Sequence, residues 1–378
     1  MNFFLLLVLW SLWFLNFSTR AVISPLMPII ENEFAISHAL AGSLFFSLAV
    51  GHTISVFLSG LLSLRIGYKR SIVYSFFMIF IALFCIRFAG NFIVFAASAF
   101  FLGLGSGIYL PGAIPLITSI FTPGNWGKAI SFHETAAALS LLAMPLLTVF
   151  LLRFLQWRSI FIVLGLACLL VNIVFWVFAP DPKPVEEKRS GLPSLLRRKD
   201  FRLMVVFWAF AAMSTAGLYS ITPLFLVKER GLSLDVANTI FGISKAGGLF
   251  VIVLLGFVLD RCSLKKIMLI TLLWTGLSTV GIAVVRNFWL LATLLFVQST
   301  LGNALFPIGF VGISKLTDSS ERSLFTGMTI SVSAIMGLGV APLALGTVAD
   351  LWNFQAGILV LGALATISCF SLRNLPEI

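Results

Sequence analysis

Three ionisable side chains interrupt long apolar stretches of the sequence, and their chemistry is the first indication of function. Arg20 and Lys245 are cations, and Glu134 is a carboxylic acid that follows His133. A charge at the centre of a bilayer costs at least about 2.5 kcal/mol, so such residues usually face a cavity or a partner. A guanidinium can hold a carboxylate through two hydrogen bonds, and an ammonium acts as a point charge. The sequence therefore predicts an anion site at Arg20 and Lys245, and proton exchange at Glu134 with His133.

Each of these charges also has a structural explanation that the sequence leaves open. Arg20 could pair with a carbonyl near a helix end and only pack the bundle. Glu134 could form an internal salt bridge, and His133 could be a hydrogen-bonded core residue. Lys245 has no acidic residue near it in its own apolar run, so a structural pairing explains it least well.

The composition requires that much apolar surface is buried in lipid. Of the 378 residues, 60% are hydrophobic and 10% are charged, and the mean hydropathy is +1.08. Soluble domains carry roughly 25% charged residues. We therefore expect a multi-pass membrane protein that is surrounded by a lipid bilayer.

Apolar runs of about 20 residues, long enough to cross a bilayer as a helix, recur along the whole chain. The first run is too long for a signal peptide and has no basic start or cleavage site, so we expect it to be retained as a span. The sequence predicts an all-α integral membrane protein with twelve transmembrane helices, at 3–30, 38–63, 71–88, 92–118, 129–152, 159–179, 202–226, 234–259, 267–285, 288–313, 324–348 and 354–372.

A charged, Pro-rich stretch separates the first six predicted spans from the last six. It reads DPKPVEEKRSGLPSLLRRKDF and is the longest connection between spans. We therefore predict an N-terminal six-helix half at 1–179, a cytoplasmic linker at 180–201 and a C-terminal six-helix half at 202–378.

The distribution of basic residues predicts the orientation. If both termini are cytoplasmic, 17 of the 25 Lys and Arg residues fall on the cytoplasmic side, 6 on the outer side and two within spans. This asymmetry follows the positive-inside rule. The net charge of +11 is therefore explained by membrane orientation, and no nucleic acid partner is needed.

The second half of the sequence repeats the first at an offset of 196 residues. GLLSLRIGYKR at 60–70 aligns with GFVLDRCSLKK at 256–266, and FSTRAVIS at 17–24 aligns with MSTAGLYS at 213–220. Six is an even number, so the duplicated halves point the same way through the membrane. Parallel repeats of this kind are typical of transporters whose substrate site lies at the midplane between the halves.

These features resemble the major facilitator superfamily, whose loop between spans 2 and 3 reads G-x-x-x-D-R-x-G-x-R/K-R/K. The second copy here has Asp260 and Arg261 in register but Ser263 in place of the glycine. The first copy keeps the glycine and has Leu64 in place of the aspartate, followed by Arg65. The resemblance implies a conformational latch formed by Asp260, Arg261 and Arg65, placed on the Asp260 side.

The first predicted span is similar to the anion:cation symporter branch of that superfamily. The branch reads N-Y-x-D-R, then S and P, then E-F-x-L-S, and the loop FTPGNWGKA at 121–129 also resembles it. Thr19 stands where the branch has an aspartate that exchanges protons, so the resemblance moves the proton site elsewhere, to Glu134. The matching residues are Asn16, Arg20, Ser24, Pro28, Glu33, Phe34 and Ser37.

The eighth predicted span is similar to that of monocarboxylate and oxalate carriers of the superfamily, which bind a carboxylate with a Lys or Arg there. Lys245 occupies this span. In the major facilitator fold, spans 4, 7 and 10 line the cavity. The resemblance therefore implies that Tyr109, Tyr219 and Asn303 contact the substrate.

Taken together, the residues and the resemblance predict a proton-coupled symporter of a small organic anion in a prokaryotic plasma membrane. We expect a monomer. We also expect no enzymatic activity and no cofactor or metal, because no nucleophile–base motif or metal-ligand spacing occurs. Two alternatives stay open: a proton-driven exporter of drugs or other small molecules, and a receptor or scaffold that does not transport. The fifth predicted span lacks the glycine-rich motif of exporters, which disfavours the first alternative.

The predicted orientation can be tested by labelling from outside the cell. In a cysteine-free background, Arg197→Cys should resist an impermeant thiol reagent, because the linker is expected in the cytoplasm. The matched Arg286→Cys should react, because its loop is expected outside. Strong external labelling at position 197 would overturn the topology.

Overall fold

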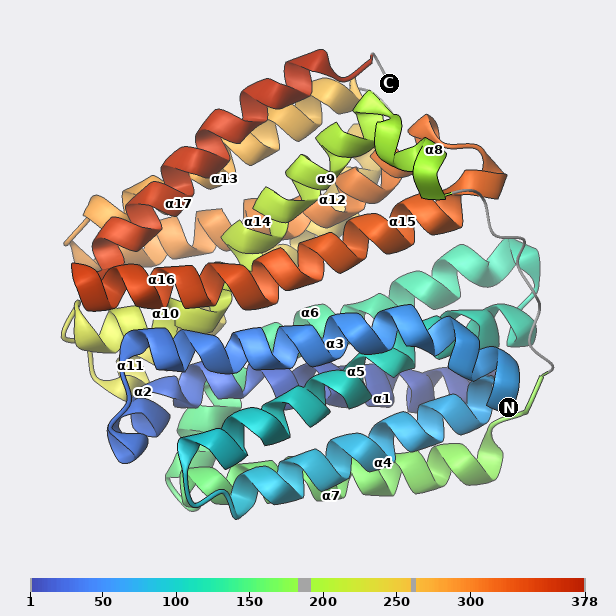
Figure 1. The fold of residues 1–378 in the computed structure, drawn as a ribbon, viewed down its shortest axis with the longest axis horizontal. Coiled ribbons are helices and arrows are strands. Elements are labelled where there is room, and N and C mark those ends of the chain that lie inside the picture. Colours follow the sequence, from blue (N-terminus) through green and yellow to red (C-terminus); the bar gives the residue numbers. More distant parts are fainter. Residues whose placement is uncertain (1, 183–191, 260–262, 377–378) are drawn as a thin grey trace. The chain divides into compact units, whose positions relative to one another are not determined.

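The computed structural model describes residues 2–182, 192–259 and 263–376, and all regular structure in these ranges is helical (Figure 1). Among the described residues, 11 helical stretches are long and apolar enough to cross a membrane. The remaining predicted span, 234–259, is formed by two shorter helices, α11 Leu234–Ser244 and α12 Ala246–Leu259. The all-α membrane fold is therefore confirmed. Asp260 and Arg261, the predicted latch residues, lie outside the described residues.

Contacts between helices group the chain into two units, and each is described by itself. In the described residues, the first unit holds 2–35 and 47–182. Within it, α4 packs against α5 and α7, and α1 packs against α6 and α7. Its helices are α1 Asn2–Ala21, α2 Ile23–Phe34, most of α3 His38–Ile66, α4 Tyr68–Arg87, α5 Phe92–Ile120, η1 Pro123–Asn125, α6 Trp126–Leu152 and α7 Trp157–Phe178.

Small residues allow the closest helix approach in the first unit. A Cβ at Gly103 of α5 would collide with the Leu48 carbonyl oxygen and come within 2.9 Å of the His52 nitrogen, both in the backbone of α3. Only glycine leaves room for these two backbones to pack so closely. The glycine run around Gly103 is thus a packing surface between helices.

The second unit holds 36–46, 192–259 and 263–376 of the described residues. Asp350 fixes the start of α3 here, because its carboxylate accepts the backbone N–H of His38 (2.9 Å) and of Ala39 (2.8 Å). The other helices are α8 Leu192–Arg197, α9 Lys199–Ala212, η2 Met213–Gly217, α10 Leu218–Lys228, α11, α12, α13 Leu264–Val284, α14 Phe288–Leu316, α15 Ser319–Ala334, η3 Ile335–Val340, α16 Ala341–Leu351, α17 Phe354–Ser368 and η4 Cys369–Asn374.

Two predicted spans of the second unit, 202–226 and 324–348, contain a π-helical turn that the apolar pattern does not reveal. These turns, η2 and η3, pack against each other. A π-turn shifts the backbone hydrogen-bond register, and π-turns are frequent at functional sites. Gln298 on α14 donates from Nε2 to the Ser214 carbonyl oxygen in η2 at 2.7 Å, so this buried carbonyl is satisfied from a neighbouring helix.

The packing of the π-turn η3 against the last residue of α9, where η2 begins, should be sensitive to a single methyl group. A Cβ at Gly337 would lie 2.6 Å from the Ala212 Cβ and 2.7 Å from its carbonyl oxygen. We expect Gly337→Ala to destabilise the protein by about 1–3 kcal/mol, the usual cost of overpacking. Thermal unfolding in detergent measures this. Gly327→Ala is the matched control, because Gly327 lies in the same span with nothing within 4 Å of its added Cβ. Equal melting temperatures for the two variants would contradict the prediction.

Candidate functional site

The two predicted anion-binding cations both lie where a membrane helix is interrupted. Arg20 is in the last turn of α1, and α2 begins at Ile23. Lys245 is the residue between α11 and α12. The last carbonyls of a helix carry partial negative charge, which stabilises a cation there. Interrupted membrane helices often supply the ion and substrate sites of transporters.

Each interruption has a cause in the sequence that follows it. Pro25 has no N–H, so it cannot donate to the Ala21 carbonyl at the end of α1. After Lys245 come Gly247 and Gly248, and the Gly248 N–H bonds the Lys245 carbonyl at 3.2 Å, three residues back instead of four. Proline and glycine therefore place each break next to a cation.

Arg20 is oriented by its own helix. Its Nε donates to the Asn16 carbonyl oxygen at 3.3 Å and its Nη2 donates to Asn16 Oδ1 at 3.1 Å, while the guanidinium lies 4.5 Å from the ring centroid of Phe17. Asn16 is completely buried and donates from Nδ2 to the Ser106 carbonyl of α5 at 3.1 Å. A guanidinium has five N–H donors, so these two bonds leave donors for a ligand. None of the ion pairs found in the described ranges includes Arg20.

Lys245 is surrounded by aromatic rings. Its Nζ lies 4.7 Å from the ring centroid of Phe241 and 5.3 Å from that of Tyr219, so the ammonium gains cation–π stabilisation. Asn303 on α14 packs against Gly248, three residues after Lys245. The structure therefore places Tyr219 beside Lys245 and Asn303 against the adjoining turn. Within the parts of the chain that the structure describes, Lys245 forms no ion pair.

His133 and Glu134 form a hydrogen-bonded group with Tyr109 in the first unit. His133 is fully buried, and its Nδ1 lies 3.1 Å from Glu134 Oε1. Its Nε2 lies 3.0 Å from the Tyr109 hydroxyl, which also donates to the Leu9 carbonyl oxygen at 2.8 Å. Neighbouring side chains on a helix project roughly 100° apart. The direct His133–Glu134 contact is therefore not evident from the sequence.

The Tyr109 hydroxyl has a single proton, and this limits how the group can be protonated. If Tyr109 donates to Leu9, His133 Nε2 must donate to the Tyr109 oxygen, and one further proton must lie between Nδ1 and Glu134. If Tyr109 instead donates to His133, then Nδ1–H donates to the Glu134 carboxylate and the further proton is absent. The Tyr109–His133 and His133–Glu134 contacts are thus satisfied with or without one extra proton, whereas the Tyr109–Leu9 hydrogen bond forms only when that proton is present.

This group combines a buried part with an accessible part. Tyr109 and His133 are completely buried, and Trp13 stacks on both rings at centroid distances of 5.3 and 5.6 Å. The Glu134 side chain is 46% exposed, so its carboxyl group is not enclosed by the protein. The Tyr109 hydroxyl is directed to His133 and Leu9, while the sequence predicts a substrate contact.

The remaining predicted residues give no second site. Arg65 is exposed in the last turn of α3, and its proposed partners lie outside the described residues, so the latch stays a prediction. In the described ranges, no three His, Cys, Asp or Glu side chains are close enough to hold a metal ion.

Comparison with known proteins identifies related sequences. The family model for the Major Facilitator Superfamily matches residues 9–253 and again residues 210–377. The hexuronate transporter of Bacillus subtilis is 22% identical over 95% of this chain and 90% of its own length. An MFS-type efflux pump of Mycolicibacterium smegmatis is 23% identical over 67% of this chain, but the match spans only 62% of the pump. A TsgA homolog of Yersinia enterocolitica is 25% identical over 74% of this chain and 73% of its own length.

Solved structures share the same fold. The nucleoside transporter NupG superposes with a TM-score of 0.85 at 14% identity, over 99% of this chain and 100% of that one. A D-xylose-proton symporter superposes with a TM-score of 0.82 at 17% identity, over 100% of this chain and 99% of that one. At these identities the likeness is evidence of architecture and not of substrate.

Proposed function

We propose that this chain, which belongs to the Major Facilitator Superfamily, is a secondary transporter that carries a small organic anion together with a proton. Members of this family move substrates across membranes, which agrees with the expectation of a transporter and not an enzyme. The predicted fold class, a helical membrane transporter of this family, is confirmed by the match to the whole chain.

The observation that carries the proposal is a pair of cations at interrupted helices without carboxylate partners in the described ranges. An unpaired cation in a membrane span is costly, so it is kept where a ligand needs it. Arg20 offers a planar set of donors that matches a carboxylate, and Lys245 offers a point charge. We therefore propose that both bind the anion, with Tyr219 and Asn303 contributing hydrogen bonds.

A carboxylate is the simplest anion for this set of donors. The relative from Bacillus subtilis that aligns with most of the chain is named as a hexuronate transporter, and a hexuronate is a sugar that carries a carboxylate. Sugar acids and other small carboxylates are therefore the first substrates to test.

We propose that the coupling proton is held between His133 and Glu134. In both protonation states the Tyr109 hydroxyl keeps a hydrogen bond with His133. It accepts from Nε2 when the extra proton is present and donates to Nε2 when that proton is absent. Tyr109 is thus proposed to act through His133 as a positioning residue, because its side chain is completely buried. Transport then follows from alternating access, since substrate and proton shift the conformational equilibrium only through contacts that differ between states.

Export is the second candidate, and one observation favours it. The efflux pump of Mycolicibacterium smegmatis is as similar to this chain as the hexuronate transporter is, although over a shorter segment. Proteoliposomes loaded on one side, with proton gradients of either sign, distinguish uptake from export. A purified chain that moves no tested compound under any gradient would favour a receptor or scaffold.

The two-cation site predicts a large loss of affinity in neutral variants. Arg20→Gln and Lys245→Gln should each weaken carboxylate binding about 10- to 150-fold, because each loses a charge-assisted interaction of about 1.5–3 kcal/mol. Binding of a hexuronate and of a panel of mono- and dicarboxylates to purified protein measures this. Lys128→Gln, at an exposed position of α6, is the control for loss of one charge. Unchanged affinity in both cation variants would remove the proposed site.

The proton site predicts uncoupling in Glu134→Gln. The amide imitates a permanently protonated carboxyl group, so substrate exchange between loaded compartments should persist while uptake driven by a pH gradient is lost. Asp235→Asn is the matched control, because Asp235 is exposed in the first turn of α11. Uptake driven by pH at the wild-type rate in Glu134→Gln would exclude Glu134 as the coupling group. Loss of both exchange and uptake would indicate a structural salt bridge.

A further inference from the structure

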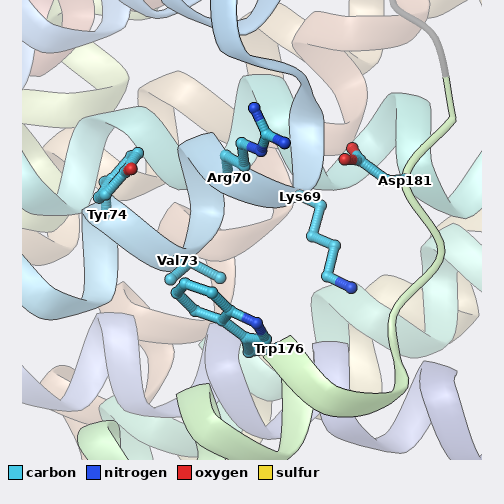
Figure 2. A pocket seen from close by; sticks show the side chains of 6 residues that line it. All are labelled: Lys69, Arg70, Val73, Tyr74, Trp176 and Asp181. Atoms are coloured by element: carbon cyan, nitrogen blue, oxygen red, sulfur yellow. The ribbon is translucent and has the colours of Figure 1, made fainter.

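The surface of the first unit has a groove between α4 and α7, and the residues that line it are not part of the proposed transport site. It consists of two adjoining hollows of about 230 and 510 Å³, which share Val73, Tyr74 and Trp176. Figure 2 shows the smaller hollow, with Lys69, Arg70 and Tyr74 on α4, Trp176 on α7, and Asp181 just beyond it. Both helices are membrane spans, so the groove begins at the end of the spans and continues to membrane depth.

The end of the groove next to the loop is positively charged. Lys69 donates from Nζ to the Ala179 carbonyl oxygen at 2.7 Å, and two of its three N–H donors remain. Arg70 is exposed at the first turn of α4. Asp181 is the one carboxylate among the residues that line this hollow. Two cations beside one carboxylate suit a phosphate that also carries hydroxyl donors.

The deeper hollow is lined by apolar side chains that are largely uncovered. Five of them have exposed fractions from 50% for Phe77 to 66% for Val177, with Tyr74, Ile173 and Trp176 between these values, whereas Val73 is buried. Such a surface suits an acyl chain. The two aromatic residues that also line the charged hollow, Tyr74 and Trp176, are of the types that favour the interface between lipid and water.

A buried polar atom in the deeper hollow also has no hydrogen-bond partner among the described residues. Asn172 is 4% exposed and donates from Nδ2 to the Val73 carbonyl oxygen at 3.1 Å, but its Oδ1 accepts no hydrogen bond from the described residues. A buried oxygen without a donor costs free energy, which a hydroxyl or a water held with an occupant would recover. The hollow therefore fits an amphiphile better than a purely apolar molecule.

We propose that this groove is a binding site for an anionic phospholipid with a hydroxylated headgroup. The phosphate lies at Lys69 and Arg70, headgroup hydroxyls donate to Asp181, and one acyl chain follows the groove past Tyr74 and Trp176. A soluble anion would need only the charged hollow, whereas the continuous apolar hollow at membrane depth requires a lipid. Basic residues beside spans attract anionic lipids by about 1 kcal/mol each, which is about fivefold in binding per cation.

Quenching of Trp176 fluorescence by lipids with brominated acyl chains tests the site. The chain has nine Trp residues, so the Trp176 signal is taken as the difference between the chain and its Trp176→Phe variant in the same vesicles. Brominated phosphatidylglycerol should quench this signal at a lower mole fraction than brominated phosphatidylcholine or phosphatidylethanolamine. Arg70→Gln should weaken the preference about fivefold, and Lys69→Gln with Arg70→Gln should remove most of it.

Controls separate the proposed site from general attraction to the membrane. Lys128→Gln with Arg197→Gln removes the same charge at two exposed positions that do not line the groove and should leave the preference unchanged. Lys69→Gln also removes the hydrogen bond to the Ala179 carbonyl oxygen and could disturb folding. Arg70→Gln keeps this bond, so it tests the charge alone. Equal quenching by all three lipids would overturn the proposal, as would a phosphatidylglycerol preference in Arg70→Gln that is as strong as in the unmodified chain. Stronger quenching by phosphatidylethanolamine would overturn the assignment to an anionic lipid.

Discussion

The structure depends on one constraint, which is that backbone polar groups in a bilayer must find their hydrogen bonds within the protein. Continuous helices meet this constraint, and they account for nearly all described residues of the spans. Each departure from a regular helix therefore needs a local compensation. In the π-turn η2, the Ser214 carbonyl accepts a hydrogen bond from Gln298. At the interruption after α11, backbone N–H groups around Lys245 bond carbonyls three residues back instead of four.

The same constraint explains why the interruptions and the cations coincide. A helix that ends inside a span leaves carbonyl groups without donors, and a cation nearby offsets their partial negative charge. A half-buried cation, in turn, needs such carbonyls or an anion to balance its own charge. Arg20 provides such compensation, because its Nε donates to the Asn16 carbonyl oxygen near the end of α1, and Lys245 lies directly at the end of α11.

The sequence predicts the positions of the spans well but not the breaks within them. Hydrophobic length sets where a helix enters and leaves the membrane, so α5, predicted at 92–118, extends from Phe92 to Ile120. The interruption at Lys245 and the π-turns change only the hydrogen-bond register, which leaves no mark in the apolar pattern. Pro25 marks the break after α1 in the sequence itself, because it has no N–H, and Gly247 and Gly248 follow the break at Lys245.

The candidate site is predictable to a similar degree. Charges inside apolar runs identify Arg20, Lys245 and Glu134 without a structure. The partners that orient them, such as Asn16 for Arg20 and Tyr109 for His133, depend on which helices pack together, and a single sequence does not show this. Asn16 contributes to the resemblance to the symporter branch, but its contact with Ser106 requires the packing of α1 against α5.

One helix of the first unit connects the cation to the proton group. The Ser106 carbonyl of α5 accepts the Asn16 amide that orients Arg20, and Tyr109, three residues later, contacts His133. Residues three apart lie on the same face of a helix. A small shift of α1 against α5 when an anion binds Arg20 would therefore change both the Asn16–Ser106 contact and the Tyr109–Leu9 contact. For symport, the anion-bound arrangement must keep Leu9 against Tyr109, so that the extra proton is retained while the anion is bound. If Leu9 moves away once the anion has left, Tyr109 donates to His133 instead, and the extra proton is released. Coupling requires an element with two discrete arrangements that both ligands bias, and we propose the Tyr109 hydroxyl as this element.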